Sequence, residues 1–153
     1  NNYYPSFSPD GKYVVFNKAG RHNNTKLGEY DCDCYSNPDA RLYIIPAAGG
    51  PPVALSRANA TGKITNSWAK WAPSSGSVSV WWLAFSSTRD YGAVLVNSTK
   101  KDIRGEKYPQ IWITAVRTDL LAQGKDPSSP AFWLPGQRTD SGNHIPFWTR
   151  TLK

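Results

Sequence analysis

The chain has 153 residues and a mass of 17.0 kDa, enough for one domain with a sizeable core. Its 12 Gly, 12 Pro and many aromatic residues, with no Met, favour short β-strands joined by turns over long helices. The net charge of +7 is spread along the chain, and the longest apolar run, residues 80–85, is too short for a membrane helix. We therefore expect neither a nucleic-acid partner nor a membrane span.

A tight hairpin begins the chain. Residues 4–8 and 12–17 have the composition of two short strands on either side of the sequence Ser8-Pro9-Asp10-Gly11. Pro9 presets φ, the Asp10 carboxylate can accept hydrogen bonds from nearby backbone, and Gly11 can adopt the positive φ that closes the turn. The sequence therefore predicts a β-hairpin here.

Two further strands complete a first unit, residues 3–58. They follow a polar loop at residues 19–40 and comprise residues 41–46 and 52–56, on either side of a Gly-Gly turn. Hairpin signals at two of the three connections predict a four-stranded antiparallel meander.

The same four strands recur in a second unit, residues 66–137. Residues 68–73 repeat residues 4–9, residues 83–86 repeat 14–17, residues 110–115 repeat 41–46, and residues 131–134 repeat 52–55. The second unit also has a long loop between its second and third strands, at residues 88–109. The chain is thus predicted to contain one structural unit twice.

A third copy begins near the C-terminus, in residues 143–150. Residues 145–149 repeat residues 4–8, with Pro146 on Pro5 and Trp148 on Phe7 and Trp71. We expect this segment to be either the first strand of a further unit or a strand that closes a ring.

The first unit resembles the blades of TolB-like β-propellers. The resemblance rests on the hairpin Phe7-Ser8-Pro9-Asp10-Gly11-Lys12 and on Leu42-Tyr43-Ile44-Ile45-Pro46-Ala47-Ala48-Gly49-Gly50, whereas the second unit lacks the turn Asp. It implies an all-β fold of two propeller blades plus one extra strand, completed by further blades in the same or another chain because closed propellers have four to eight. A two-sheet sandwich is the alternative fold.

The resemblance implies a non-enzymatic scaffold that binds a protein partner in the periplasm or outside the cell. The alternatives are the accessory propeller of a larger hydrolase or peptidase whose catalytic domain is absent from this chain, and a metal-dependent polysaccharide lyase. Because the chain begins at Asn1 rather than Met, we also expect a processed or truncated product. Three glycosylation sequons lie in predicted loops, at Asn23, Asn59 and Asn97.

The sequence contains no catalytic motif, and we expect neither catalytic activity nor a cofactor. His144 is expected to line a central channel and His22 to lie in solvent. Cys32 and Cys34 are two residues apart, which leaves open a strained disulfide, two separate thiols or a weak metal site. Such a metal site would also need ligands from the same loop, where the candidates are His22, Glu29, Asp31 and Asp33.

The long loops at residues 19–40 and 88–109 are the predicted binding face. In a propeller blade, these loops would lie side by side on one rim, and loops commonly carry function. The first loop is acidic, with Glu29, Asp31 and Asp33, and the second is basic. The basic set consists of Arg89, Lys100, Lys101, Arg104 and Lys107. Opposite charges on adjacent loops predict that they contact each other or share a partner surface.

Overall fold

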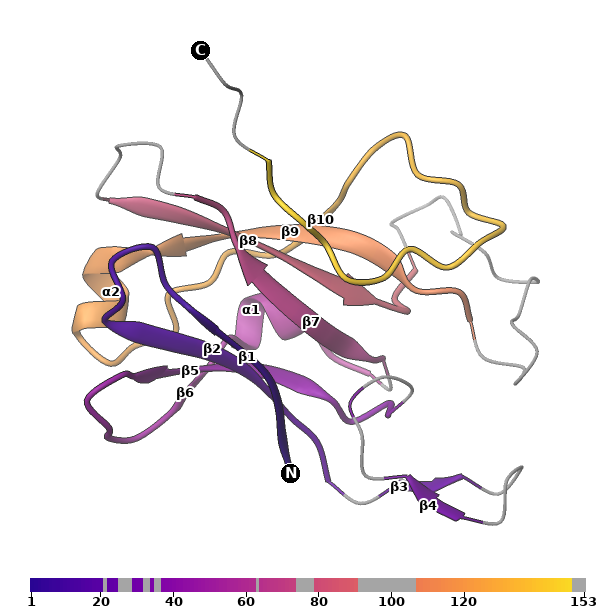
Figure 1. Cartoon of the computed structure of the whole chain (residues 1–153), viewed down its shortest axis with the longest axis horizontal. Helices are drawn as coiled ribbons and strands as arrows, with labels where there is room; N and C mark the ends of the chain where they lie inside the picture. The colour runs from indigo at the N-terminus through magenta and orange to yellow at the C-terminus, as the bar shows by residue number, and fades with distance from the viewer. Residues whose placement is uncertain are drawn as a thin grey trace.

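The computed structural model shows an all-β protein whose two four-stranded antiparallel sheets pack on a shared core (Figure 1). It describes residues 1–20, 22–24, 29–31, 34, 37–62, 64–73, 79–90 and 107–149, with only the backbone for residues 22–24 and 29–31. Within these ranges a two-stranded hairpin and two short helices complete the structure. No helix of the described ranges has the length and apolar character needed to cross a membrane.

Sheet 1 is the meander predicted for residues 3–58. It comprises β1 (Asn2–Phe7), β2 (Tyr13–Lys18), β5 (Arg41–Pro46) and β6 (Val53–Ala54), paired in that order. The first turn has the predicted chemistry. Asp10 Oδ1 accepts hydrogen bonds from the Ser8 hydroxyl at 2.7 Å and the Lys12 N–H at 3.0 Å, and Gly11 has a φ of +73°. The local signals in this hairpin therefore determine its geometry.

Sheet 2 repeats this arrangement. It comprises β7 (Asn66–Trp71), β8 (Val80–Ser87), β9 (Gln110–Arg117) and β10 (Phe132–Trp133), also paired in chain order. The strand registers correspond as well. Val15 pairs with Ile44 in sheet 1, and their equivalents Ala84 and Ile113 pair in sheet 2. The two units are therefore alike strand for strand.

Three equivalent residues share an unusual backbone conformation. The φ angle is +52° at Tyr4, +56° at Trp68 and +48° at Ile145. This left-handed region costs a non-glycine residue about 1–2 kcal/mol. In β1 and β7 the residue lies in a bulge that interrupts pairing with the next strand. An unfavourable conformation kept at three equivalent positions identifies these segments as copies of one structural element.

A side-chain amide extends the hydrogen bonding of the third strand in each sheet. In sheet 1 the Asn59 amide accepts from the Leu42 N–H at 2.7 Å and donates to the Leu42 carbonyl at 3.0 Å. In sheet 2 the Gln137 amide makes the same two bonds to Ile111, at 2.7 and 2.9 Å. Because Leu42 and Ile111 are equivalent, this pair of amide hydrogen bonds, called the clamp, occurs in both sheets.

Asn59 is buried, so the folded protein does not present the glycosylation sequon that begins at this residue.

Replacing Asn59 by alanine should lower the free energy of unfolding by about 2 kcal/mol, because it leaves the buried Leu42 N–H without an acceptor. The matched control is Gln137→Ala, where the clamp is partly exposed and water can substitute. The control should lose about 1 kcal/mol or less. Urea denaturation of both variants checks this expectation, and equal losses would contradict it.

The two sheets meet through non-equivalent faces. Sheet 1 contributes aliphatic side chains to the shared core: Val15, Leu42 and Ile44. Sheet 2 contributes larger side chains: Leu83, Phe85 and Trp112. The sheet 1 equivalents of this second set are partly exposed on the other face: Val14, Phe16 and Tyr43. A sandwich related by a two-fold axis would join equivalent faces, so the stacking here is head to tail, as between successive repeats.

Several elements differ from the sequence-based expectations. Helix α1 (Ser56–Asn59) begins where the fourth strand was predicted to end, and α2 (Thr118–Ala122) follows β9. Hairpin β3 (His22–Asn24) and β4 (Glu29–Asp31) lies within the loop at residues 19–40. For α1 the reason lies in tertiary contacts. The Arg57 and Ala58 N–H groups donate to Asp126 and Ser128 side chains at 3.1 Å.

Residues 145–149 form no β-strand within the described structure, and their role as the first strand of a further unit or as a ring-closing strand stays a prediction. Within the described part of the chain, no strand pairs with them. They are held instead through a side chain, since the Trp148 indole N–H donates to the Lys70 carbonyl of β7 at 3.0 Å. The segment therefore keeps the repeat's backbone conformation without its strand partner.

Candidate protein-binding rim

The loops predicted to form the binding face leave the two sheets at the same end. The Asn17 side chain, near the end of β2, donates to the Asn66 carbonyl of β7 at 2.6 Å. Asn66 in turn pairs with Ser87, the last residue of β8. The ends of β2 and β8 are thus neighbours across the two sheets. This end and its described flanks are called the loop rim: residues 37–41, 87–90 and 107–110.

Arg89 does not belong to the exposed rim surface to which the sequence assigned it. Its relative exposure is 8%, and the guanidinium donates to groups inside the protein. Nη2 donates to the Ala58 carbonyl at 2.7 Å and to Asn66 Oδ1 at 2.5 Å, and Nε donates to the Ser87 hydroxyl at 3.0 Å. This arginine therefore joins α1 to sheet 2, and a contact between Arg89 and a partner stays a prediction.

Two aromatic rings contact the Arg89 guanidinium. Its Cζ lies 5.1 Å from the Phe85 ring centroid and 5.0 Å from that of Trp112, distances suited to cation–π attraction. Burial and the nearby Arg41 lower the pKa of Arg89 to about 10. At neutral pH the group therefore stays charged. None of the ion pairs that join described residues includes Arg89, so backbone carbonyls and π faces compensate its charge.

Arg41 has a related structural role at the start of β5. Its Nη1 donates to the carbonyls of Pro38 and Ile64, each at 2.9 Å, and its Nη2 donates to the Gly62 carbonyl at 2.7 Å. These bonds hold the connection between the sheets against the rim. The two arginines therefore stabilise the base from which the loops emerge.

Lys107 is the predicted binding cation that the structure does place at the surface of the rim. Its Nζ lies 2.7 Å from Asp90 Oδ2, and the two side chains are 37% and 36% exposed. The pair joins the described residues on either side of residues 91–106. An exposed pair of this kind contributes at most about 1 kcal/mol to stability. Lys107 is therefore available to a partner at little structural cost.

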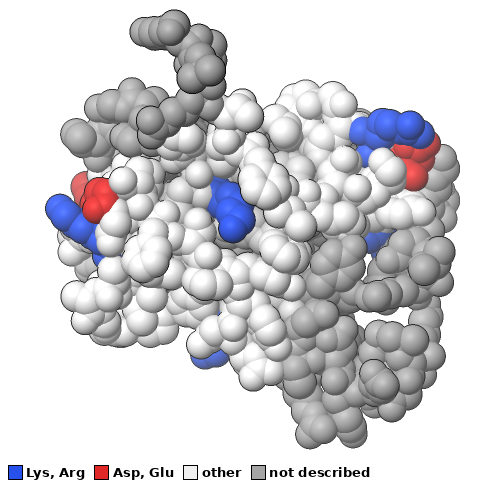
Figure 2. Space-filling view, in the orientation of Figure 1, with Lys and Arg blue, Asp and Glu red and all other residues white. Residues whose placement is uncertain are grey.

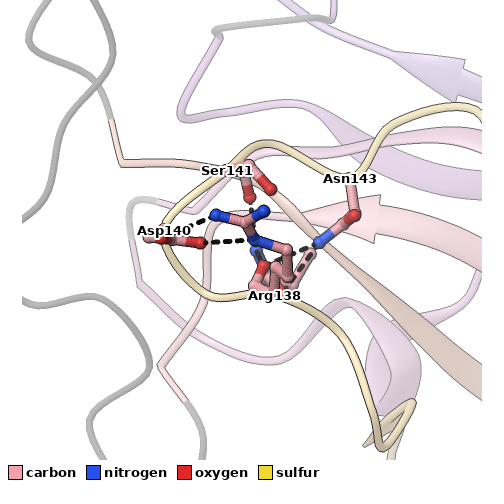
Figure 3. Close-up of polar contacts among 5 residues, drawn as sticks. Arg138, Asp140, Ser141 and Asn143 are labelled. Atoms are coloured by element: carbon pink, nitrogen blue, oxygen red, sulfur yellow. Dashed lines mark hydrogen bonds and ion pairs between the residues drawn. The ribbon is translucent and has the colours of Figure 1, made fainter.

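A polar cluster around Gln110 holds the C-terminal segment beside the rim, and Figure 3 labels four residues of this cluster. The buried Gln110 amide donates to the carbonyls of Arg138 and Ser141 at 3.3 and 3.1 Å. Asn143 donates to Gln110 Oε1 at 3.2 Å and to the Arg138 carbonyl at 3.0 Å. Arg138 also pairs with Asp140 at 3.0 Å.

Gln110 is the repeat equivalent of Arg41, and both residues donate to carbonyls in the connection that follows their unit. Gln110 was not among the predicted site residues. The sequence did carry a signal for this residue, because the third strand of each unit begins with a long polar side chain.

The cysteine pair falls partly outside the described residues. Cys34 is fully buried and packs with Ala19 and Ala40. Cys32 and Asp33 lie outside the described residues, so the disulfide and the metal site stay predictions. Among the described residues, no three His, Cys, Asp or Glu side chains are grouped as metal ligands would be.

The remaining predicted binding residues are not placed as side chains. Lys100, Lys101 and Arg104 lie outside the described residues, and Glu29 and Asp31 are described only as backbone in β4. The contact between an acidic and a basic loop therefore remains a prediction. His22 has only its backbone described, in β3, and His144 is half-buried next to Gly142.

Charge on the described surface is dispersed. On the face shown in Figure 2, the described Lys and Arg side chains are spread apart rather than gathered in one patch. Two of the described arginines form exposed ion pairs, Arg117 with Asp119 at 2.6 Å and Arg138 with Asp140 at 3.0 Å. Recognition through the described residues of this face would therefore depend on individual contacts.

A cavity of about 350 Å³ lies at the opposite end of the sheets from the loop rim. Its lining is mostly Pro and aliphatic, with one lysine and one tyrosine: Lys12, Tyr13, Ile44, Pro46, Pro51, Pro52, Val53, Leu121, Ala122 and Gly124. This lining lacks the paired acid, base or nucleophile that catalysis would require. We assign it no catalytic chemistry.

Comparison with protein-family models, curated proteins and solved structures finds no match to this chain. The fold alone defines its class, an all-β protein with two antiparallel four-stranded sheets that pack on a shared core.

Proposed function

We propose that this chain is a non-enzymatic protein-binding or scaffolding module built from TolB-like propeller blades, with the loop rim as its binding face. The observation that carries the proposal is an indole-to-carbonyl hydrogen bond that occurs at two equivalent places in the chain. The Trp71 indole N–H donates to the Ser6 carbonyl at 3.1 Å, and Trp148, the equivalent residue, donates to the Lys70 carbonyl at 3.0 Å. Ser6 and Lys70 are equivalent too, so each unit is set on the one before it in the same way.

The exposed faces support a structure that continues beyond two sheets. Each four-stranded unit buries one face against a neighbour, and two units are too few to close a ring. Phe7 is 65% exposed, whereas its equivalent Trp71 is 8% exposed because sheet 1 covers it. The proposal therefore includes further blades, in the same or another chain. From the resemblance to TolB-like blades, it also includes a location in the periplasm or outside the cell.

The rim function can be tested with matched charge reversals. Lys107→Glu alters the rim, whereas Arg117→Glu breaks a similar exposed ion pair at the opposite end of β9. In affinity capture from the source organism, the rim variant should lose specific protein partners by at least about tenfold, and the control should keep them. Deleting residues 94–106 should have the same effect as Lys107→Glu while the circular dichroism stays β-type. Equal capture by all variants would contradict the proposed rim.

A further inference from the structure

The cavity at the opposite end of the sheets from the loop rim lies between the two structural units. One wall comes from sheet 1, at the start of β2, the end of β5 and the turn that leads into β6. The other wall comes from α2 of the second unit, which lies beside these turns (Figure 1). The first unit has no equivalent helix, because residues 47–52 connect its third and fourth strands directly. The cavity is therefore specific to this junction rather than a feature of each repeat.

The apolar part of the lining suits a flat aromatic ring. Three prolines, Pro46, Pro51 and Pro52, form rigid surface that offers no N–H donor. Val53 and Leu121 add aliphatic surface. Proline rings pack well against aromatic rings, as they do where Pro-rich peptides bind aromatic grooves. The volume of about 350 Å³ is at the small end of the range for ligand cavities, so the ligand that it suits is small.

Backbone acceptors of the lining already have donors. The Lys12 carbonyl accepts a hydrogen bond from the Ala47 N–H at 2.8 Å. The Pro46 carbonyl accepts one from the Gly49 N–H at 2.9 Å. A ligand in the cavity would therefore gain little from carrying hydrogen-bond donors of its own.

The polar side chains of the lining are donors, and they belong to Lys12 and Tyr13. The printed bonds of both residues come from their backbone N–H groups, and no described residue accepts from the Lys12 ammonium or the Tyr13 hydroxyl. Asp10 attracts the Lys12 ammonium electrostatically, but the two form no ion pair. An ammonium beside a hydroxyl favours a ligand group that accepts hydrogen bonds and carries negative charge, as a carboxylate does.

We propose that this cavity binds a small aromatic carboxylate, with the ring between the prolines and α2 and the carboxylate on the Lys12 ammonium and the Tyr13 hydroxyl. Because such a ligand contacts both units, its binding stabilises their junction. The site is separate from the loop rim and goes beyond the proposed function.

The probe is para-trifluoromethylbenzoate, because its ring and carboxylate match the lining and its fluorine NMR signal is distinct from every signal of the protein. Titration with the whole 153-residue chain should show saturable binding with a dissociation constant below about 1 mM. The neutral analogue para-trifluoromethylbenzyl alcohol should bind at least about tenfold more weakly, because it lacks the charge. Absence of saturable binding up to about 5 mM benzoate, or equal affinity for the two compounds, would overturn the inference.

Protein variants test the placement of the ligand. Lys12→Gln removes the charge at an exposed position and should weaken benzoate binding at least about tenfold. Its matched control is Lys18→Gln, at the other end of β2 and over the Tyr43 ring, which should bind as the wild type does. Ala122→Phe adds a ring to the cavity wall and should also weaken binding at least about tenfold. Binding that either Lys12→Gln or Ala122→Phe leaves unchanged would overturn the inference, whereas Lys107→Glu tests only the rim and should leave the affinity for benzoate intact.

Discussion

Replacing Trp71 by alanine should lower the free energy of unfolding by about 3–5 kcal/mol, because it removes a large buried ring from the core between the sheets. The ring makes an edge-to-face contact with Trp81, with centroids 5.8 Å apart. Its indole N–H also provides the hydrogen bond to Ser6 in β1. One substitution thus removes both apolar packing and a polar contact between the two units.

The two contributions can be separated. Trp71→Phe keeps an aromatic ring but loses the donor to the Ser6 carbonyl, so it should cost about 1–2 kcal/mol. Phe7→Ala is the control for position within the repeat, because Phe7 is equivalent to Trp71 but has no neighbouring sheet in the described chain. It should change stability by less than about 1 kcal/mol. Equal effects of Trp71→Ala and Phe7→Ala in urea denaturation would refute the head-to-tail stacking.

The strands and their order could be predicted because their signals are local. The Ser-Pro-Asp-Gly turn and the recurrence of each strand with its aromatic residues define two similar meanders without reference to distant contacts. Trp81 and Trp82 are consecutive in β8 and lie on opposite faces of the sheet, as strand geometry requires.

The roles of polar residues at the rim could not be predicted, because their partners are remote in sequence. Arg89 bonds to Ala58 and Asn66, which precede it by 31 and 23 residues. From local sequence alone, a charged residue at the start of a long loop cannot be distinguished from one that is exposed to solvent. Helix α1 similarly depends on Asp126 and Ser128, about 70 residues further along the chain. Only the folded structure brings these groups together.

Replacing Arg89 by alanine should lower the free energy of unfolding by about 3–5 kcal/mol, the largest polar effect that we expect. The substitution leaves the Ala58 carbonyl and Asn66 Oδ1 without this buried donor and removes the cation that packs against two aromatic rings. Arg89→Lys should recover only part of the loss, because a single ammonium lacks the planar fork that reaches these acceptors.

The exposed Arg138 provides the matched control. Its side chain is 78% exposed and pairs only at the surface with Asp140, so Arg138→Ala should change stability by less than about 0.5 kcal/mol. If Arg89 were a partner-binding residue instead, Arg89→Ala would leave urea denaturation unchanged and reduce only association. Measuring both properties for both variants therefore distinguishes a buried structural arginine from a surface contact.

The pH dependence of stability offers an independent measurement of the same burial. The pKa of Arg89 falls from its ordinary value in the unfolded chain to about 10 in the folded protein, so above about pH 10 the unfolded state binds more protons. Stability contributed by this group should therefore increase as the pH rises above about 10, whereas below that pH its contribution should be constant. Arg89→Met cannot titrate, so the wild-type stability should rise relative to this variant between about pH 9 and pH 11. A difference that stays flat across that range would mean that the hydrogen bonds and aromatic contacts of the guanidinium offset the effect of burial on its pKa.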